Sequence, residues 1–218
     1  MKCFVIAMQK EANPVIESMK TEKDFVCCGK RIVTGMAHGQ KIAVVICGVG
    51  KVNAASGAQY AIDCLGADVI VNIGVAGGLN GGVEIAKTYA VSAAVQYDFD
   101  LTQLNGTAIG TLDECKENYL PLCVASGFPS KKAATGDRFN DSPEDYKLLT
   151  EVLGADIREM ELGAIAQVCM HAKVKCYSFK IISDIAGSGS TTRQYLENLE
   201  ACYLSIKRDL PEIIKLTV

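Results

Sequence analysis

The sequence has 218 residues, of which 49% are hydrophobic and 22% are charged, a composition typical of a folded globular protein. The net charge is −3, no basic cluster occurs and tryptophan is absent, which argues against nucleic-acid binding. No apolar run reaches the ~18 residues that a membrane-spanning helix needs.

The first predicted element is a buried strand over residues 2–8, because the apolar run stops at Gln9 and no signal-peptide cleavage site follows. Without a secretory signal, the ten cysteines are expected to be reduced thiols in a cytoplasmic protein. Five of them lie in apolar patterns, where we expect them to pack as small hydrophobic residues: Cys3, Cys47, Cys64, Cys169 and Cys176. Cys27 and Cys28 are interpreted in the same way, as strand packing.

An amphipathic helix is predicted over residues 11–19, followed by short strands over 25–28 and 31–36. Glu11 comes directly after the first strand, at the strand end where open α/β sheets place their ligand sites. The alternative is an ordinary first-turn glutamate. Residues 41–47 are almost continuously apolar, as expected for a strand covered on both faces.

A glycine-rich turn, Gly48-Val49-Gly50-Lys51, joins this strand to a helix that is predicted to end near Leu65. Such a turn leaves backbone N–H groups available for an anion or a polar ligand. The third glycine of a dinucleotide-binding fingerprint is missing, and no phosphate-binding Walker sequence occurs. A generic dinucleotide-binding domain is therefore a poor alternative.

The next buried strand is predicted over residues 68–74, and four glycines follow it within residues 75–82. Glycines at this density indicate close approach of the backbone to another strand or to a ligand. A further strand is predicted over 87–95. Residues 105–118 show little pattern and are predicted to be a loop.

Two short strands are predicted over residues 120–125 and 132–135, with a polar loop over 136–141. Ser142 followed by Pro143 predicts a helix N-cap, and the helix should end near residue 153.

A short strand over residues 155–158 leads into Glu159-Met160-Glu161, at the predicted start of a helix. The helix dipole and free N–H groups favour carboxylates at this position. The two glutamates are therefore either solvated first-turn residues or a sugar-binding pair, in which carboxylates accept hydrogen bonds from vicinal hydroxyls and the thioether packs on a flat face.

The last predicted strand, over residues 175–182, ends in Ser183-Asp184. A linker or lid over 187–190 and an amphipathic helix over 192–216 complete the chain. Strands and helices alternate, which indicates a three-layer α/β/α fold with a central mixed, mainly parallel sheet. No domain boundary is evident, so residues 1–218 are predicted to form a single domain.

Six sequence motifs follow one another along the chain: Glu11, Gly48 to Ala55, Asn72 to Gly78, Gly136 to Phe139, Glu159 to Glu161, and Ile182 to Asp184. In this arrangement the chain resembles the nucleoside phosphorylase family. Within that family it is most similar to the purine nucleosidases that cleave 5′-thio-substituted adenosines, and the resemblance covers nearly the whole chain.

The resemblance implies hydrolysis of an N-glycosidic bond through a state with positive charge on the ribose and negative charge on the departing purine. It assigns Asp184, supported by Ser183, as the acid that protonates N7 of the purine. Glu11 is expected to activate water, and Glu161 to bind the ribose hydroxyls. An acid near neutral pH needs a raised pKa.

The resemblance also implies a set of substrate contacts. Phe139 is expected to stack on the purine, and the backbone of Asn140 to contact the edge of the base. Met160 should pack on the sugar and base, while Glu159 either touches the sugar or only holds the turn. Val49, in the glycine-rich turn, is expected to contact the substrate.

Two positions depart from the family pattern. Val75 replaces a small hydroxyl residue on the water or phosphate side of the ribose, which argues against phosphate binding. Lys180 replaces an arginine, so it keeps the charge but loses the bidentate fork. Arg138 in the base loop replaces a smaller residue, and Arg158 is interpreted as solvated or loop-bracing.

Three alternatives remain open: a relative with another 5′ group or purine, such as a futalosine hydrolase; a nucleoside phosphorylase; or a catalytically silent nucleoside-binding protein. For a phosphorylase, arginines are expected near the glycine-rich loops, and Arg31 is the only early one. The resemblance implies no metal and no organic cofactor. It also implies a homodimer, whose second copy would cover the apolar segment 74–79.

Overall fold

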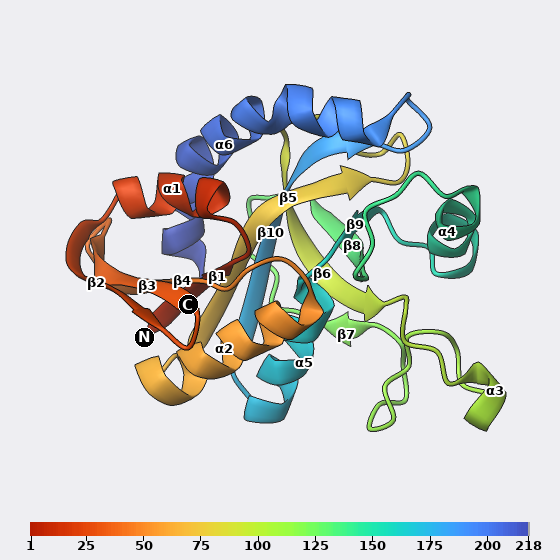
Figure 1. Cartoon of the computed structure of the whole chain (residues 1–218), viewed down its shortest axis with the longest axis horizontal. Helices are drawn as coiled ribbons and strands as arrows, with labels where there is room; N and C mark the ends of the chain where they lie inside the picture. Colours follow the sequence, from red (N-terminus) through yellow and green to blue (C-terminus); the bar gives the residue numbers. More distant parts are fainter. Residues whose placement is uncertain (218) are drawn as a thin grey trace.

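The computed structural model describes residues 1–217 and has three layers (Figure 1). A central mixed sheet separates two helices on one face, α1 and α6, from two on the other, α2 and α5. The helices are α1 (Gln9–Glu17), α2 (Lys51–Leu65), α3 (Thr102–Asn105), α4 (Pro143–Lys147), α5 (Leu162–Ala172) and α6 (Thr191–Leu216). The strands are β1 (Lys2–Ile6), β2 (Lys20–Cys27), β3 (Lys30–Ala37), β4 (Gln40–Ile46), β5 (Val69–Gly78), β6 (Thr88–Gln96), β7 (Leu120–Pro121), β8 (Ser130–Thr135), β9 (Ile157–Glu159) and β10 (Lys175–Ile185).

The sheet runs in the order β10-β6-β8-β9-β5-β1-β4-β3-β2, with β7 paired to β6. The strands β10, β5, β1 and β4 form a continuous parallel centre, and the hairpin β2–β3 extends it antiparallel at one edge. The additional pairing of β5 with β10 joins the two ends of the series β10-β6-β8-β9-β5, so this part of the sheet closes on itself.

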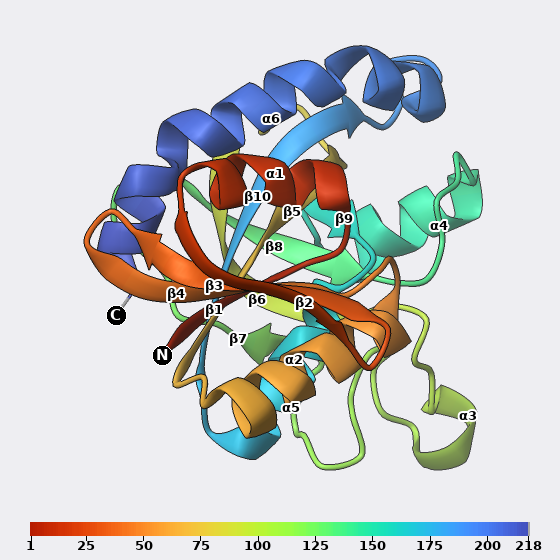
Figure 2. The same cartoon turned by 60° about the vertical axis from the view of Figure 1, so that its left-hand side comes forward.

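Both faces of the central strands are buried, which explains their continuous apolar runs. In β1, Cys3 and Val5 pack in the core with α2 and α5, whereas Phe4 and Ile6 pack in the core with α1 and α6. Figure 2 shows the same arrangement from the side, with α1 and α6 together above the sheet. Burial of each such side chain stabilises the fold by about 1.5–3 kcal/mol.

Strand β5 changes its neighbour along its length, and this change positions the site. Its first half pairs with β1 as far as Asn72, and its end pairs with β9 from Gly77 onward. Between these positions, residues 73–76 have neither β1 nor β9 beside them, while β10 stays paired on the other side. A gap therefore opens beside β5, between the carboxyl end of β1 and the strand β9, at the edge of the sheet where α/β folds bind ligands.

The predicted elements are present, with differences at their ends. Strand β2 begins at Lys20 rather than at residue 25, and the short helix α3 ends at the first residue of the predicted loop. Ser142 caps α4 as predicted, but the helix continues after Lys147 as a π-helical turn, Leu148–Val152. The expectation that segment 74–79 needs cover from a second copy is wrong, because all of it except the half-buried Val75 is buried within the chain.

All ten cysteines are free thiols, and several are buried in the core as predicted. Cys64 is an exception because it is exposed, and Cys28 is exposed at the β2–β3 turn rather than packed in a strand. Within residues 1–217, no helix combines the length and the apolar character needed to span a bilayer.

Candidate active site

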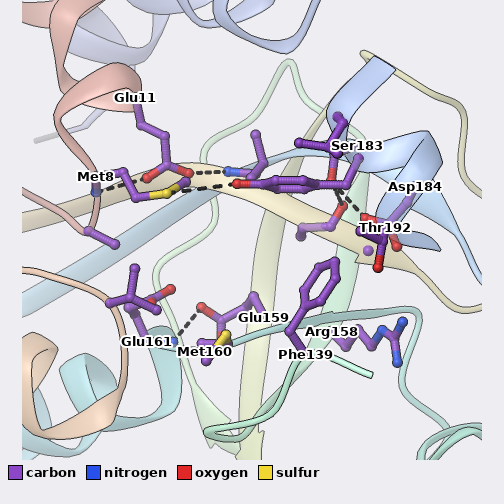
Figure 3. A pocket seen from close by; sticks show the side chains of 17 residues that line it. Met8, Glu11, Phe139, Arg158, Glu159, Met160, Glu161, Ser183, Asp184 and Thr192 are labelled. Atoms are coloured by element: carbon purple, nitrogen blue, oxygen red, sulfur yellow. Dashed lines mark hydrogen bonds between the residues drawn. The ribbon is translucent and has the colours of Figure 1, made fainter. Parts of the chain in front are cut away.

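A cavity of about 420 Å³ occupies the gap beside β5 (Figure 3). Its wall comes from the ends of β1, β5 and β10, from the β9–α5 junction, from the loop around Phe139 and from the start of α6. Nine of the predicted site residues line it: Glu11, Val49, Val75, Phe139, Glu159, Met160, Glu161, Ser183 and Asp184.

Glu11 lies in the first turn of α1 and is buried. Its Oε1 accepts a hydrogen bond from the Val75 N–H at 2.8 Å, and its Oε2 accepts one from the Met8 N–H at 3.1 Å. A Cβ atom at Gly74 would lie 2.7 Å from Oε1, so only glycine fits beside this carboxylate. Burial raises the pKa of Glu11, and the hydrogen bond from Val75 and the charge of Lys180 only partly oppose it.

Asp184 lies near the end of β10, on the opposite side of the cavity from Glu11 (Figure 3). Its Oδ2 accepts a hydrogen bond from the Ser183 hydroxyl at 2.8 Å, whereas its buried Oδ1 has no partner. A Cβ atom at Gly77 would lie 2.8 Å from Oδ1. Burial raises the pKa of Asp184, while the Ser183 hydrogen bond and the positive charge of Arg158 act to lower it.

Glu161 connects the cavity to the glycine-rich turn. Its Oε1 accepts a hydrogen bond from the Gly50 N–H at 2.9 Å, and Asp137 accepts one from the next amide, Lys51 N–H, at 2.8 Å. These two amides at the start of α2, which the sequence left available for an anion, are therefore used by carboxylates of the chain itself. Burial and the negative charge of Glu159 raise the pKa of Glu161 to about 7.

Glu159 holds the strand-to-helix turn. Its Oε2 accepts hydrogen bonds from the N–H groups of Glu161 and Leu162, at 3.0 and 2.8 Å, and from Lys180 Nζ at 2.9 Å. Its Oε1 accepts a hydrogen bond from the Thr135 hydroxyl. Because both its oxygens are engaged within the chain, the turn-holding alternative describes this residue best.

Lys180 is fully buried on β10 and does not line the cavity, since its ammonium group faces Glu159. Burial acts to lower the pKa of Lys180, but the negative charges of Glu159 and Glu161 outweigh it and raise the pKa. The side chain of Asn140 is also turned from the cavity, toward Asp145 at 2.7 Å. The position of Lys180 therefore does not support direct substrate contact, and Asn140 is not part of the cavity lining.

The aromatic wall includes one residue that the sequence analysis missed. Phe139, which is 51% exposed, meets the ring of Tyr195 edge to face, with centroids 5.5 Å apart. Tyr195 lies on α6 together with the cavity residues Thr192 and Leu196. These three positions could have been found from their i, i+3 and i+4 spacing, which places them on one helix face.

Of the two interpretations of Arg158 from the sequence, the solvated one is wrong. Arg158 lines the cavity, and its side chain is only 12% exposed, so it is not solvated. Its nearest carboxylate is that of Asp141, at 3.9 Å between Nη2 and Oδ1. This distance is consistent with the loop-bracing interpretation but leaves Nη2 without a hydrogen bond.

The chain belongs to the phosphorylase superfamily, whose family model matches residues 2–208. This result confirms the nucleoside phosphorylase-like fold and family expected from the six sequence motifs. Among its relatives, the aminodeoxyfutalosine nucleosidase of Campylobacter jejuni is 29% identical over 192 residues, 83% of this chain and 84% of that protein. The 5′-methylthioadenosine/S-adenosylhomocysteine nucleosidase of Halalkalibacterium halodurans is 33% identical over 196 residues, 84% of each chain.

A solved structure agrees with these relatives. The 5′-methylthioadenosine/S-adenosylhomocysteine nucleosidase of Colwellia psychrerythraea, in complex with adenine, superposes with a TM-score of 0.89 at 27% identity. The match covers 100% of this chain and 96% of that one. The expected resemblance to the purine nucleosidases within the family is thus confirmed.

Proposed function

We propose that the protein hydrolyses the N-glycosidic bond of 5′-thio-substituted adenosines, methylthioadenosine and S-adenosylhomocysteine, to adenine and the thioribose. The observation that carries this proposal is the arrangement of three buried carboxylates around one cavity. Glu11 and Asp184 face it from opposite sides, and Glu161 faces it from the β9–α5 junction. The relatives described above are nucleosidases, which supports the same reaction.

Asp184 is proposed as the general acid. Burial raises the pKa of Asp184, which favours its acid form, and the hydrogen bond from Ser183 fixes one oxygen while Oδ1 remains unpaired. This proton passes to N7 of the purine as the C1′–N9 bond breaks, so the base leaves as a neutral molecule. Phe139 provides a face on which the purine can stack.

Glu11 is proposed as the base on the other side of the sugar. The backbone N–H groups of Val75 and Met8 fix its carboxylate, so its geometry is set before the substrate arrives. It takes a proton from the attacking water, whose oxygen forms the new bond to C1′. Glu161, anchored by Gly50, accepts hydrogen bonds from the ribose hydroxyls, and its negative charge stabilises the positive sugar in the transition state.

Three observations favour water over phosphate as the acceptor. The amides of Gly50 and Lys51 already bind carboxylates, so they are not available to a phosphate. Val75 has no hydroxyl to offer. Arg31 is engaged by both oxygens of Asp24, at 3.0 and 2.6 Å, and is therefore paired within the chain.

The experiment is to mix the protein with methylthioadenosine, with and without inorganic phosphate, and to follow free adenine. We expect adenine in both reactions and no sugar phosphate. Release only with phosphate would identify a phosphorylase, whereas binding without release would identify a silent nucleoside-binding protein. The Campylobacter relative makes a substrate with another 5′ substituent the second candidate. The same assay with such a nucleoside in place of methylthioadenosine would test it.

We propose further that the protein is a homodimer in which the second copy closes the cavity. Val49 and Leu196 line the cavity but are 46% and 66% exposed, so its apolar rim is open on one side. Light scattering during size-exclusion chromatography should give twice the chain mass of 23.3 kDa. A monomer that is fully active at the same concentration would refute this part of the proposal.

A further inference from the structure

The described residues contain two buried side-chain atoms without a hydrogen-bond partner, Asp184 Oδ1 and Arg158 Nη2. Buried polar groups are almost always paired, so an exception needs an explanation. Both groups approach the same point of β5. A Cβ atom at Gly77 would lie 2.8 Å from Asp184 Oδ1 and 3.2 Å from Arg158 Nε. The unpaired acid and the incompletely paired guanidinium therefore lie at the same end of the active-site cavity (Figure 3).

The partners available to Arg158 within the chain are insufficient. Asp141 is 3.9 Å from Nη2, beyond hydrogen-bond distance, and its carboxylate already accepts hydrogen bonds from the hydroxyl and the N–H of Thr191. Arg158 also lines a second cavity of about 410 Å³, bounded by residues 141–143, Tyr146 and the segment after β10. It is the only described residue that lines both cavities.

We propose that Arg158 is a specificity-determining residue that extends the accepted bases from 6-aminopurines to 6-oxopurines. This inference rests on the proposed function, because it places the purine edge against Asp184. Asp184 in its acid form donates to N7, and Arg158 donates beside it. A 6-oxopurine presents two acceptors to these donors, N7 and O6, whereas a 6-aminopurine presents N7 and an N–H group.

The same contact favours cleavage of a 6-oxopurine. As the glycosidic bond breaks, negative charge spreads from the imidazole ring into the exocyclic oxygen, and a guanidinium held nearby stabilises it. With a 6-aminopurine the N–H group faces the guanidinium, which then turns toward Asp141, its nearest carboxylate. Arg158 therefore acts mainly on the choice between bases, since both reactions use Asp184 and Glu11.

The test compares 5′-methylthioinosine with 5′-methylthioadenosine as substrates, by the release of hypoxanthine or adenine. The wild-type protein should hydrolyse both. Arg158→Leu should lower kcat/KM for the inosine compound by about 10- to 100-fold more than for the adenosine compound, the usual effect of losing a charged hydrogen bond. For Arg158→Lys, the loss should lie between those of the wild type and Arg158→Leu, because lysine keeps the charge but not the planar set of N–H donors.

Arg138→Leu is the matched control. Arg138 is an arginine of the neighbouring loop, but it pairs with Asp145 at 3.2 Å and is absent from the wall of either cavity. Its loss should leave the ratio of the two substrates unchanged. If Arg158→Leu lowers both activities equally, or if the wild type cleaves only the adenosine compound, the inference is wrong while the proposed function stands.

If the wild type cleaves neither nucleoside, the proposed function fails, and binding of the free bases then tests the inference separately. Calorimetric titration with hypoxanthine and with adenine needs no turnover. Arg158→Leu should weaken hypoxanthine binding by the same 10- to 100-fold relative to adenine. Equal weakening of both bases, or none, would contradict the assignment, and thermal unfolding of each variant shows whether it is folded.

Discussion

Lys180 Nζ lies 2.9 Å from Glu159 Oε2, and both side chains are only 1% exposed. The pair joins β10 to the end of β9 beneath the cavity. Glu159 in turn accepts a hydrogen bond from the N–H of Glu161, the residue proposed to bind the ribose hydroxyls. The position of Glu161 therefore depends on Lys180, although Lys180 does not line the cavity. An ion pair at this depth is strongly coupled, because neither partner can be solvated once the other is removed.

Lys180→Met should therefore destabilise the protein by about 3–5 kcal/mol, since it leaves a buried carboxylate without its counter-ion. Urea unfolding measures the change. The double variant Lys180→Met/Glu159→Gln should recover a large part of the loss, because the amide keeps one acceptor oxygen without the charge. A double variant as unstable as the sum of the single ones would show that the pair is not coupled.

Asp184→Asn should remove most turnover, by about 10²–10⁴-fold in kcat, because an amide cannot deliver a proton to N7. Substrate binding should change little, since size and burial are retained. Asp137→Asn is a suitable control: Asp137 accepts the Lys51 N–H outside the cavity, and an amide oxygen can replace it. Near-normal rates in Asp184→Asn would remove Asp184 from the role of acid.

Gly74→Ala should lower kcat by roughly 10²-fold, because the new Cβ atom would lie 2.7 Å from Glu11 Oε1 and displace the proposed base. The stability of the fold should be less affected than the activity, because only the side chain of Glu11 has to move. Gly81→Ala is the matched control, because its Cβ atom would meet no atom within 4 Å. Steady-state kinetics on both variants separates loss of catalysis from a general effect of replacing glycine.

Stability should depend on pH through Glu161. Its pKa is about 7 in the folded protein and 4.5 as the ordinary value, so between these values the folded state binds more protons than the unfolded state. Stability therefore falls as pH rises from about 4.5 to 7, by up to about 3 kcal/mol from this group. The Glu161→Gln variant should lack this pH-dependent contribution, so its stability relative to the wild type should be highest above pH 7. Urea unfolding at pH 5 and at pH 8 measures the free energy of unfolding of both proteins. Equal pH dependence in both proteins would contradict the raised pKa.

The order and type of the elements could be predicted because the central strands are buried on both faces and give continuous apolar runs. The carboxylates Glu11, Glu161 and Asp184 could be located because each follows a recognisable strand end. Closure of the sheet through the pairing of β5 with β10 and β9 could not be predicted, because it depends on contacts between residues far apart in the sequence.

Arg158 shows the same limit at the level of one side chain. An arginine next to a strand end is usually solvated, and no local pattern distinguishes this one. Its side chain packs against Gly77, which comes from another part of the chain. The role of Glu159 likewise depended on partners at Thr135 and Lys180, which its own neighbourhood in the sequence does not reveal.

The two glycines of β5 that lie against the carboxylates, Gly74 and Gly77, are three residues apart. With a rise of about 3.3 Å per residue, the strand separates these two contact points by about 10 Å. The backbone of β5 thus sets the distance between its contact with Glu11, on the water side of the substrate, and its contact with Asp184, on the base side. Inserting or deleting one residue between these glycines would turn one of them to the other face of the strand, so its close contact with Glu11 or Asp184 would be lost.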